Sequence, residues 1–80
     1  MKNLKTKYIL ISKKDICYFQ FILEGYEGFV AATTIEKKRA VVKLFIIQEF
    51  QDSVADILKE LKKEIDFKEI EFSETGERHD

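Results

Sequence analysis

The stretch Ala40-Val41-Val42-Lys43-Leu44-Phe45-Ile46-Ile47 decides the fold, because seven of its eight residues are apolar and most are β-branched or aromatic. Such a run is typical of a strand in the middle of a sheet, apolar on both faces. Its side chains alternate between the two faces and form two rows. One row is Val42, Leu44 and Ile46, and the other is Val41, Phe45 and Ile47. If the first row points at covering helices, the second points away from them.

Three further segments read as strands around this one. Residues 29–35 precede it, and the charged connection 36–39 is short enough for an antiparallel hairpin. Residues 7–11 (Lys-Tyr-Ile-Leu-Ile) are apolar on both faces, as a second central strand should be. Residues 67–72 (Phe-Lys-Glu-Ile-Glu-Phe) mix apolar and charged residues in equal number, which predicts a half-exposed edge strand.

Two helices separate these strands. Ser12-Lys13-Lys14-Asp15 fits a capping box, which predicts that a helix opens at Ser12 and runs to Glu24. Gly25 then stands where a left-handed residue would end the helix. The second helix, over residues 50–65, has one apolar stripe and an opposite solvated face, typical of a helix lying on a sheet. The stripe consists of Phe50, Val54, Ile57, Leu58, Leu61 and Ile65.

The order strand–helix–strand–strand–helix–strand predicts an α+β fold of ferredoxin-like topology. With right-handed crossovers, both helices lie on one face of a four-stranded antiparallel sheet of order 4-1-3-2. The chain of 80 residues is long enough for one domain. We expect that domain to span residues 1–73, followed by a mobile tail over residues 74–80.

Composition and charge narrow the possible functions. With 15 acids against 14 bases, the chain lacks the cationic excess usual in nucleic-acid-binding domains. No signal peptide and no apolar run near the ~20 residues needed to cross a bilayer can be seen, so we expect a cytoplasmic protein without membrane contact. The first 14 residues carry +5 and residues 49–80 carry −6. Either the two ends lie side by side, or the first is a basic arm that binds nucleic acid.

The string Phe21-Ile22-Leu23-Glu24-Gly25-Tyr26-Glu27-Gly28, followed by Thr33-Thr34, resembles a family of short bacterial proteins classified only as a domain of unknown function. The resemblance extends over roughly residues 7–72. It implies no particular activity.

The arrangement of elements is also similar to the ACT regulatory domain. That similarity implies pairing of domains and binding of amino acids at the interface between them. ACT ligand sites typically use a glycine in the turn between the first strand and the first helix. The corresponding turn here, Ser12–Asp15, contains no glycine. This difference leaves the similarity in fold intact and weakens the expectation that the chain binds amino acids.

The sequence offers little for catalysis, and we expect no catalytic, metal-binding or cofactor-binding residues. The lone Cys17 has no base near it in sequence, because the one histidine is His79, and we expect a packed, inert thiol. The carboxylate pairs Glu24 with Glu27 and Glu69 with Glu71 fit solvated positions better than a catalytic pair. One alternative stays open, an enzyme whose acid or base is Glu24 or Glu27 beside Tyr26.

A second alternative is a domain that binds single-stranded RNA. Some domains of this topology stack bases on aromatic side chains of the first and third strands. Tyr8 and Phe45 could occupy such positions, but Val41–Phe45 lacks the glycine and aromatic spacing of that signature. Nucleic acid is therefore not the partner that we expect.

The most informative feature is a surplus of apolar side chains. The outward row of the 40–47 strand and the outward side chains of the 7–11 strand leave the open sheet face apolar, where a monomer should be polar. The first helix is apolar over ~260° of its circumference, far more than one buried face requires. The predicted interface residues are Tyr8, Leu10, Val41, Phe45 and Ile47 of the sheet with Tyr18 and Phe21 of the helix.

We therefore predict a homodimer or higher homo-oligomer, with a small ligand between subunits as a further possibility. The alternative is that the arm Met1–Thr6 or the C-terminal tail covers the apolar face within one chain.

Overall fold

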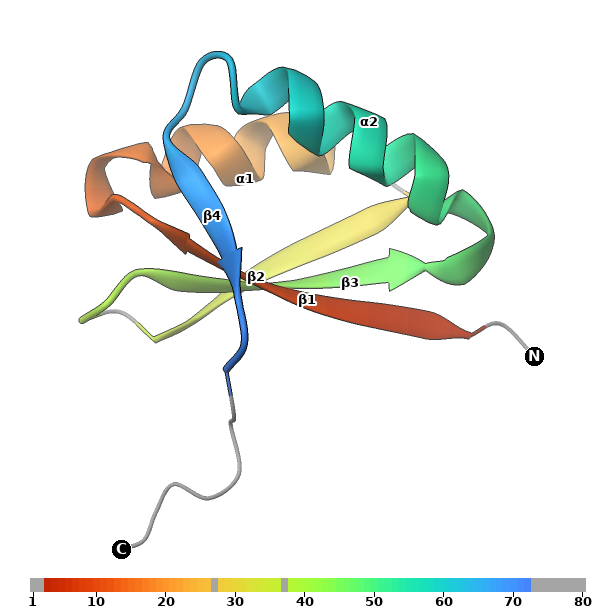
Figure 1. Cartoon of the computed structure of the whole chain (residues 1–80), viewed down its shortest axis with the longest axis horizontal. Helices are drawn as coiled ribbons and strands as arrows, with labels where there is room; N and C mark the ends of the chain where they lie inside the picture. The colour runs from red at the N-terminus through yellow and green to blue at the C-terminus, as the bar shows by residue number, and fades with distance from the viewer. Residues whose placement is uncertain (1–2, 27, 37, 73–80) are drawn as a thin grey trace, which may run out of the picture.

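The structure is a computed structural model that describes residues 3–26, 28–36 and 38–72. It contains four strands and two α-helices in the predicted order (Figure 1). The strands are β1 (Leu4–Ile11), β2 (Val30–Glu36), β3 (Val41–Ile47) and β4 (Phe67–Ile70), and the helices are α1 (Ile16–Glu24) and α2 (Gln51–Leu61). A 3-10 turn precedes each helix, at Lys13–Asp15 and Gln48–Phe50.

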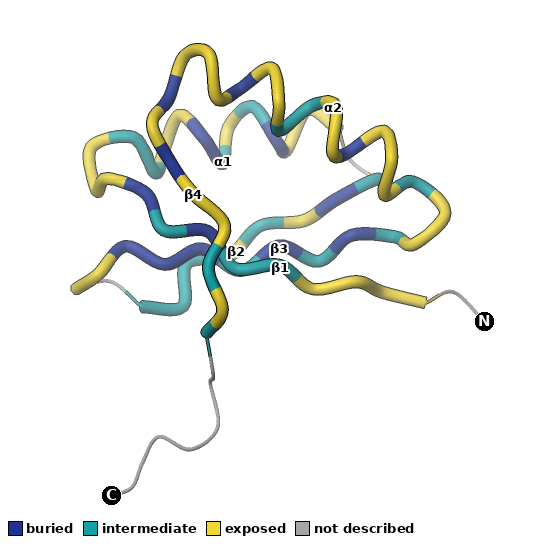
Figure 2. Tube along the Cα trace, viewed as in Figure 1, coloured by how far each residue is buried: buried dark blue, intermediate teal, exposed yellow. Residues whose placement is uncertain are grey.

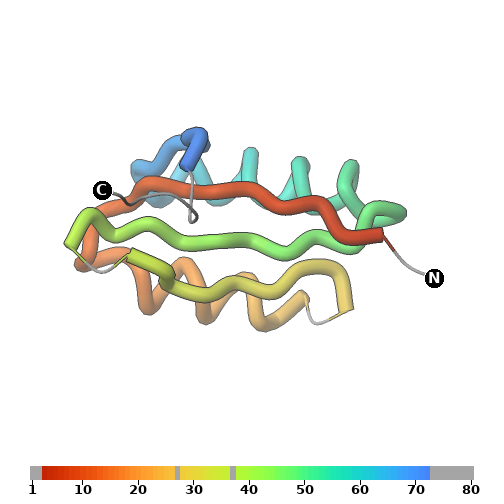
Figure 3. The backbone as a smooth tube through the Cα atoms, turned by 90° about the horizontal axis from the view of Figure 1, so that it is seen from below, coloured from red at the N-terminus to blue at the C-terminus, as the bar shows by residue number. Residues whose placement is uncertain are grey.

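The sheet confirms the predicted topology. Its order is β2-β3-β1-β4, which is the order 4-1-3-2 read from the other edge, and every neighbouring pair is antiparallel. The apolar strand β3 lies between β2 and β1, as its sequence indicates. Figure 3 shows the sheet from the side that no helix covers, with both helices behind it.

The core fills the space between the sheet and the two helices. On β3 the buried core residues are Val42, Leu44 and Ile46, and on β1 they are Ile9 and Ile11. From the helices, Phe19, Leu23, Val54 and Leu61 pack against them. Figure 2 shows these buried positions alternating with more exposed ones along the strands, as a two-layer fold requires.

β1 and β4, which pair with each other, differ from their predicted bounds. β1 begins at Leu4, because Leu4 is the partner of Ile47 and the antiparallel pairing continues from there to Leu10. β4 is shorter than predicted, since its pairing with β1 covers Phe67 to Ile70 only. The predicted tail over residues 74–80 lies outside the described residues.

The predicted capping box is wrong. The side chain of Ser12 makes no capping hydrogen bond. Instead the backbone carbonyl of Ser12 accepts a hydrogen bond from the backbone N–H of Asp15 at 2.9 Å, which closes a 3-10 turn. The α-helix therefore begins at Ile16, four residues later than the sequence pattern indicated.

The predicted left-handed conformation of Gly25 is also wrong. Gly25 has φ −68°, and its N–H donates to the carbonyl of Ile22, so α1 ends in a tightened right-handed turn. In the turn that follows α1, a positive φ falls instead at Gly28, at 93°, where the N–H of Phe29 donates to the carbonyl of Tyr26 and the chain enters β2. Glycine suits this position because it has no Cβ to oppose a positive φ.

Candidate interaction surfaces

The face of the sheet opposite the helices is largely apolar. Because Ile9, Ile11, Val42, Leu44 and Ile46 point into the core, the alternate residues of β1 and β3 point outward. These outward residues are Leu4, Thr6, Tyr8, Leu10, Val41, Lys43, Phe45 and Ile47. Six of the eight are apolar, and both helices lie on the other side of the sheet (Figure 1). We call this surface the outer sheet face.

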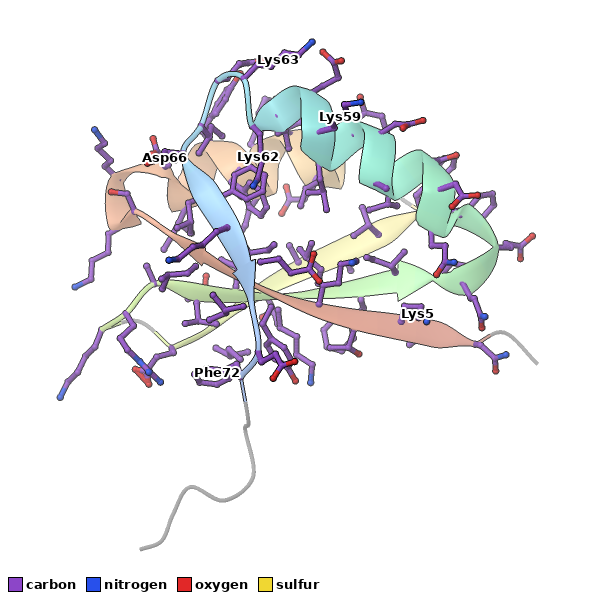
Figure 4. All side chains as sticks on the ribbon, in the orientation of Figure 1. Lys5, Lys59, Lys62, Lys63, Asp66 and Phe72 are labelled. Atoms are coloured by element: carbon purple, nitrogen blue, oxygen red, sulfur yellow. The ribbon has the colours of Figure 1, made fainter. Side chains whose placement is uncertain are left out.

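Two cations and three aromatic rings meet on the outer sheet face. The ring of Phe72 lies 5.6 Å from that of Tyr8, and the guanidinium of Arg39 lies 5.1 Å from the Phe72 ring centre. The ammonium of Lys43 lies over the rings of both Phe45, at 5.0 Å, and Tyr8, at 5.8 Å. Phe72 points away from the helices (Figure 4). Part of the apolar surface is therefore covered within one chain.

The predicted sheet residues differ in how much surface they offer. Tyr8, Leu10, Phe45 and Ile47 are each partly exposed. Val41 is fully buried although it lies outside the inner core, so it has no surface to give to a partner. Leu4, which was not among the predicted interface residues, is 57% exposed at the start of β1.

Helix α1 carries the second apolar surface. Phe21 is 70% exposed and Tyr18 is 44% exposed, in agreement with the expectation that α1 has more apolar residues than the sheet can cover. Tyr26, just after the helix, adds a third exposed ring. The apolar run Phe21-Ile22-Leu23 just before Tyr26 is the sequence signal that this exposed surface extends beyond the helix.

Tyr18 ties α1 to the segment that follows α2. Its hydroxyl donates a hydrogen bond of 2.7 Å to the carboxylate of Glu64. This hydrogen bond and the negative charge of Glu64 both favour the protonated phenol, so they raise the pKa of Tyr18 above its ordinary value. The hydrogen bond therefore holds the exposed ring of Tyr18 against the segment that follows α2.

The structure places the remaining candidate residues apart. Cys17 is exposed rather than packed, because it lies about 200° around the helix from the buried Phe19. Glu24 is also exposed, and Glu27 and His79 lie outside the described residues. Among the described residues, no three His, Cys, Asp or Glu side chains are grouped so that they could hold a metal ion.

The two oppositely charged ends of the chain meet across the edge of the sheet. Lys7 of β1 donates to both carboxylate oxygens of Glu69 in β4, at 3.1 and 3.2 Å. This contact supports the interpretation that the charge imbalance between the ends is compensated within the fold.

A depression of about 690 Å³ lies beside the turn between β1 and α1. Carboxylates of Asp15, Glu64 and Asp66 and ammonium groups of Lys14 and Lys68 line it. Leu10 lines it as well, so the depression adjoins the outer sheet face.

The fold defines a small α+β domain of ferredoxin-like topology, and none of the described helices is long and apolar enough to cross a membrane. Within that class, residues 9–65 match the family described as "Domain of unknown function (DUF4911)", and the chain belongs to this family. No curated protein and no solved structure gives a significant match.

Proposed function

We propose that the chain is a non-catalytic module that associates with a second copy of itself through the outer sheet face. The observation that carries the proposal is that five apolar side chains of β1 and β3 are at least partly exposed on a face that neither helix covers: Leu4, Tyr8, Leu10, Phe45 and Ile47. The open face of an antiparallel sheet in a monomer is ordinarily polar, and contiguous exposed apolar surface commonly marks a contact with another molecule.

The size of the chain also favours association. A domain of this length buries only about 60–65% of its unfolded surface, so its single core is modest. Pairing two outer sheet faces would add a second apolar layer, and an ordinary specific interface needs about 800 Å² per subunit. The α1 surface, with Phe21 and Tyr18, would serve as an additional contact in a larger assembly.

Sedimentation velocity over a range of concentrations tests the proposal. Phe45→Lys introduces a charge on the outer sheet face, while the buried side of β3 is untouched, so we expect the dimer to dissociate and the circular dichroism to stay unchanged. Phe21→Lys is the matched variant on α1, and we expect it to leave the dimer intact. A wild-type chain that stays monomeric at every concentration would overturn the proposal, as would a dimer that survives Phe45→Lys.

We further propose that a small ligand binds in the depression beside the β1–α1 turn. Its lining offers both carboxylates and ammonium groups, which suits a zwitterion such as an amino acid, and Leu10 connects it to the outer sheet face. Saturable amide chemical shift changes at Ser12 and Lys14 during an amino-acid titration would support this part. A titration that leaves both amides unmoved would reject the ligand and leave self-association standing.

The second candidate function is binding of single-stranded RNA. The specific observation in its favour is the set of aromatic rings, Tyr8, Phe45 and Phe72, in contact with the cations Arg39 and Lys43. Bases stack on such rings, and cations beside them attract the phosphate backbone. Fluorescence anisotropy with a labelled oligonucleotide at two salt concentrations would detect it, because cation contacts make the affinity fall with salt.

A further inference from the structure

A small hollow of about 250 Å³ opens on the helix side of the sheet, between α2 and the junction of β1 with β4. Its floor is apolar and its rim is charged. The floor consists of Ile9, Ala55, Leu58 and Phe67, and the rim consists of Lys7, Lys59, Lys62 and Glu69. It lies on the opposite side of the sheet from the outer sheet face, so a ligand bound here would not depend on self-association.

The shortness of β4 leaves room for this hollow. β4 pairs with Tyr8 to Ile11, and among the described residues no strand continues along the Leu4–Lys7 part of the same edge. α2 passes above with Ala55, whose short side chain leaves space at the opening. The exposed Ala55 and the half-buried Leu58 therefore offer apolar surface at the edge, with the buried Ile9 and Phe67 beneath them.

The rim carries more positive than negative charge. Glu69 is the single carboxylate among the lining residues, and its oxygens are already held by Lys7 at 3.1 and 3.2 Å. Within the described part of the chain, neither Lys59 nor Lys62 forms an ion pair. The ammonium of Lys62 lies 5.5 Å from the ring centre of Phe67, directly beside the hollow. Figure 4 shows Lys62 lying next to β4.

We infer that this hollow binds a small apolar carboxylate, a molecule with an aromatic or branched aliphatic body and one anionic head. The apolar body would lie on Ile9, Leu58 and Phe67, and the carboxylate would accept hydrogen bonds from Lys59 and Lys62. A volume of about 250 Å³ corresponds to about eight water molecules of ~30 Å³ each, which is room for roughly ten non-hydrogen atoms.

The charge and the shape together exclude other ligand classes. A cation would be repelled by Lys59 and Lys62, and a neutral apolar molecule would gain no attraction from the two ammonium groups. An inorganic anion would gain nothing from the apolar floor. For a ligand of this size with one charged head, we expect a Kd of about 0.1–1 mM, since small ligands gain limited free energy per atom.

The test is a titration of the 15N-labelled chain with 3-phenylpropionate, followed by amide chemical shifts. We expect saturable shifts at Ile9, Ala55, Leu58 and Phe67, and none from the neutral analogue 3-phenylpropionamide at the same concentrations. The double variant Lys59→Gln with Lys62→Gln should weaken binding at least tenfold. Lys63→Gln, in the turn just after α2, is the matched control, since Lys63 is paired with Glu60 and does not line the hollow, and it should bind as the wild type does.

A second variant tests the hollow without altering its charge. Ala55→Leu places a larger side chain at an exposed helical position that lines the hollow, so it should abolish binding while the chain stays folded. The inference is overturned if 3-phenylpropionate causes no saturable shifts, if the amide binds equally well, or if the double lysine variant or Ala55→Leu retains the wild-type affinity.

Discussion

Lys7 and Glu69 face one another across the β1–β4 edge, with both oxygens of the carboxylate within 3.2 Å of the ammonium. The pair joins the positive N-terminal segment of the chain to the negative C-terminal half. Both side chains are more than a third exposed, so water and salt screen the attraction.

The first prediction concerns this pair. We expect Glu69→Gln to lower the free energy of unfolding by less than about 1 kcal/mol, because exposed ion pairs typically contribute only that much. Urea denaturation at low and at high salt measures it, and the difference between wild type and variant should shrink as salt is added. A loss above about 2 kcal/mol would show that the pair is much less screened than its exposure indicates.

The second prediction compares two phenylalanines that are two residues apart in α1. Phe19 is fully buried and its ring meets that of Phe67 at 5.1 Å, whereas Phe21 is largely exposed. Phe19→Ala should lower the free energy of unfolding by about 3–5 kcal/mol, through lost burial and an unfilled cavity. Phe21→Ala should change it by less than about 0.5 kcal/mol.

A domain of this size has about 4–12 kcal/mol of stability in total, so Phe19→Ala leaves little margin. If that variant does not fold, Phe19→Leu, with an expected loss of about 1–2 kcal/mol, provides the comparison. Equal effects at positions 19 and 21 would contradict the orientation of α1.

The strands and helices also show how much of the fold the sequence pattern could predict. The apolar run of β3 and the stripe of α2 predicted the topology, because a period of two or of 3.6 determines which face each residue occupies. The failures, at Ser12 and Gly25, are local: a 3-10 turn and an α-helix end use similar residues, and backbone hydrogen bonds decide between them.

The candidate surfaces were predictable only in part. Alternation placed Tyr8 and Phe45 on the outer sheet face, but it could not predict that Phe72 and Arg39 would stack beside Tyr8. The hollow beside α2 could not be predicted from the sequence for the same reason. It depends on where β4 stops relative to Lys59 and Lys62, and nothing in the sequence pattern of one element specifies that distance.

The third prediction is a backbone effect at Gly28. Because φ at Gly28 is 93°, Gly28→Ala should lower the free energy of unfolding by about 1–2 kcal/mol, even though a Cβ would have open space around it. Gly25→Ala is the matched comparison. Gly25 has right-handed angles that alanine adopts without strain, which favours the variant, while its Cβ would come within a tight 3.2 Å of the carbonyl oxygen of Ile22, which opposes it. The two effects offset one another, so we expect a change within about 0.5 kcal/mol. Thermal unfolding of the two variants side by side distinguishes them, and the reverse order would refute the assignment of the turn.

The fourth prediction concerns pH. The pKa of Tyr18 is raised in the folded chain by its hydrogen bond to Glu64 and by the charge of Glu64. A raised folded-state pKa means that the stabilising contact is complete below the ordinary tyrosine pKa near 10 and is lost as the pH rises through the folded-state value. NMR titration of the Tyr18 ring carbons should show a late transition, and Glu64→Gln should move it to lower pH. A Tyr18 transition that Glu64→Gln leaves in place would show that the hydrogen bond is absent in solution.

The fifth prediction separates the two candidate functions of the outer sheet face, because Lys43 affects them in opposite directions. Its ammonium lies over the rings of Phe45 and Tyr8, in the middle of the surface that a second copy would cover. Covering a charge costs free energy, so Lys43→Met, which retains an unbranched apolar stem, should tighten a dimer about five- to tenfold in sedimentation experiments.

If the face binds single-stranded RNA instead, the same variant should weaken binding and reduce the salt dependence of the affinity by about one counterion. Lys63→Met, remote from this face, should change neither. A dimer whose affinity Lys43→Met leaves unchanged would place the contact on another surface, because Lys43 lies between Tyr8 and Phe45 in the middle of the outer sheet face.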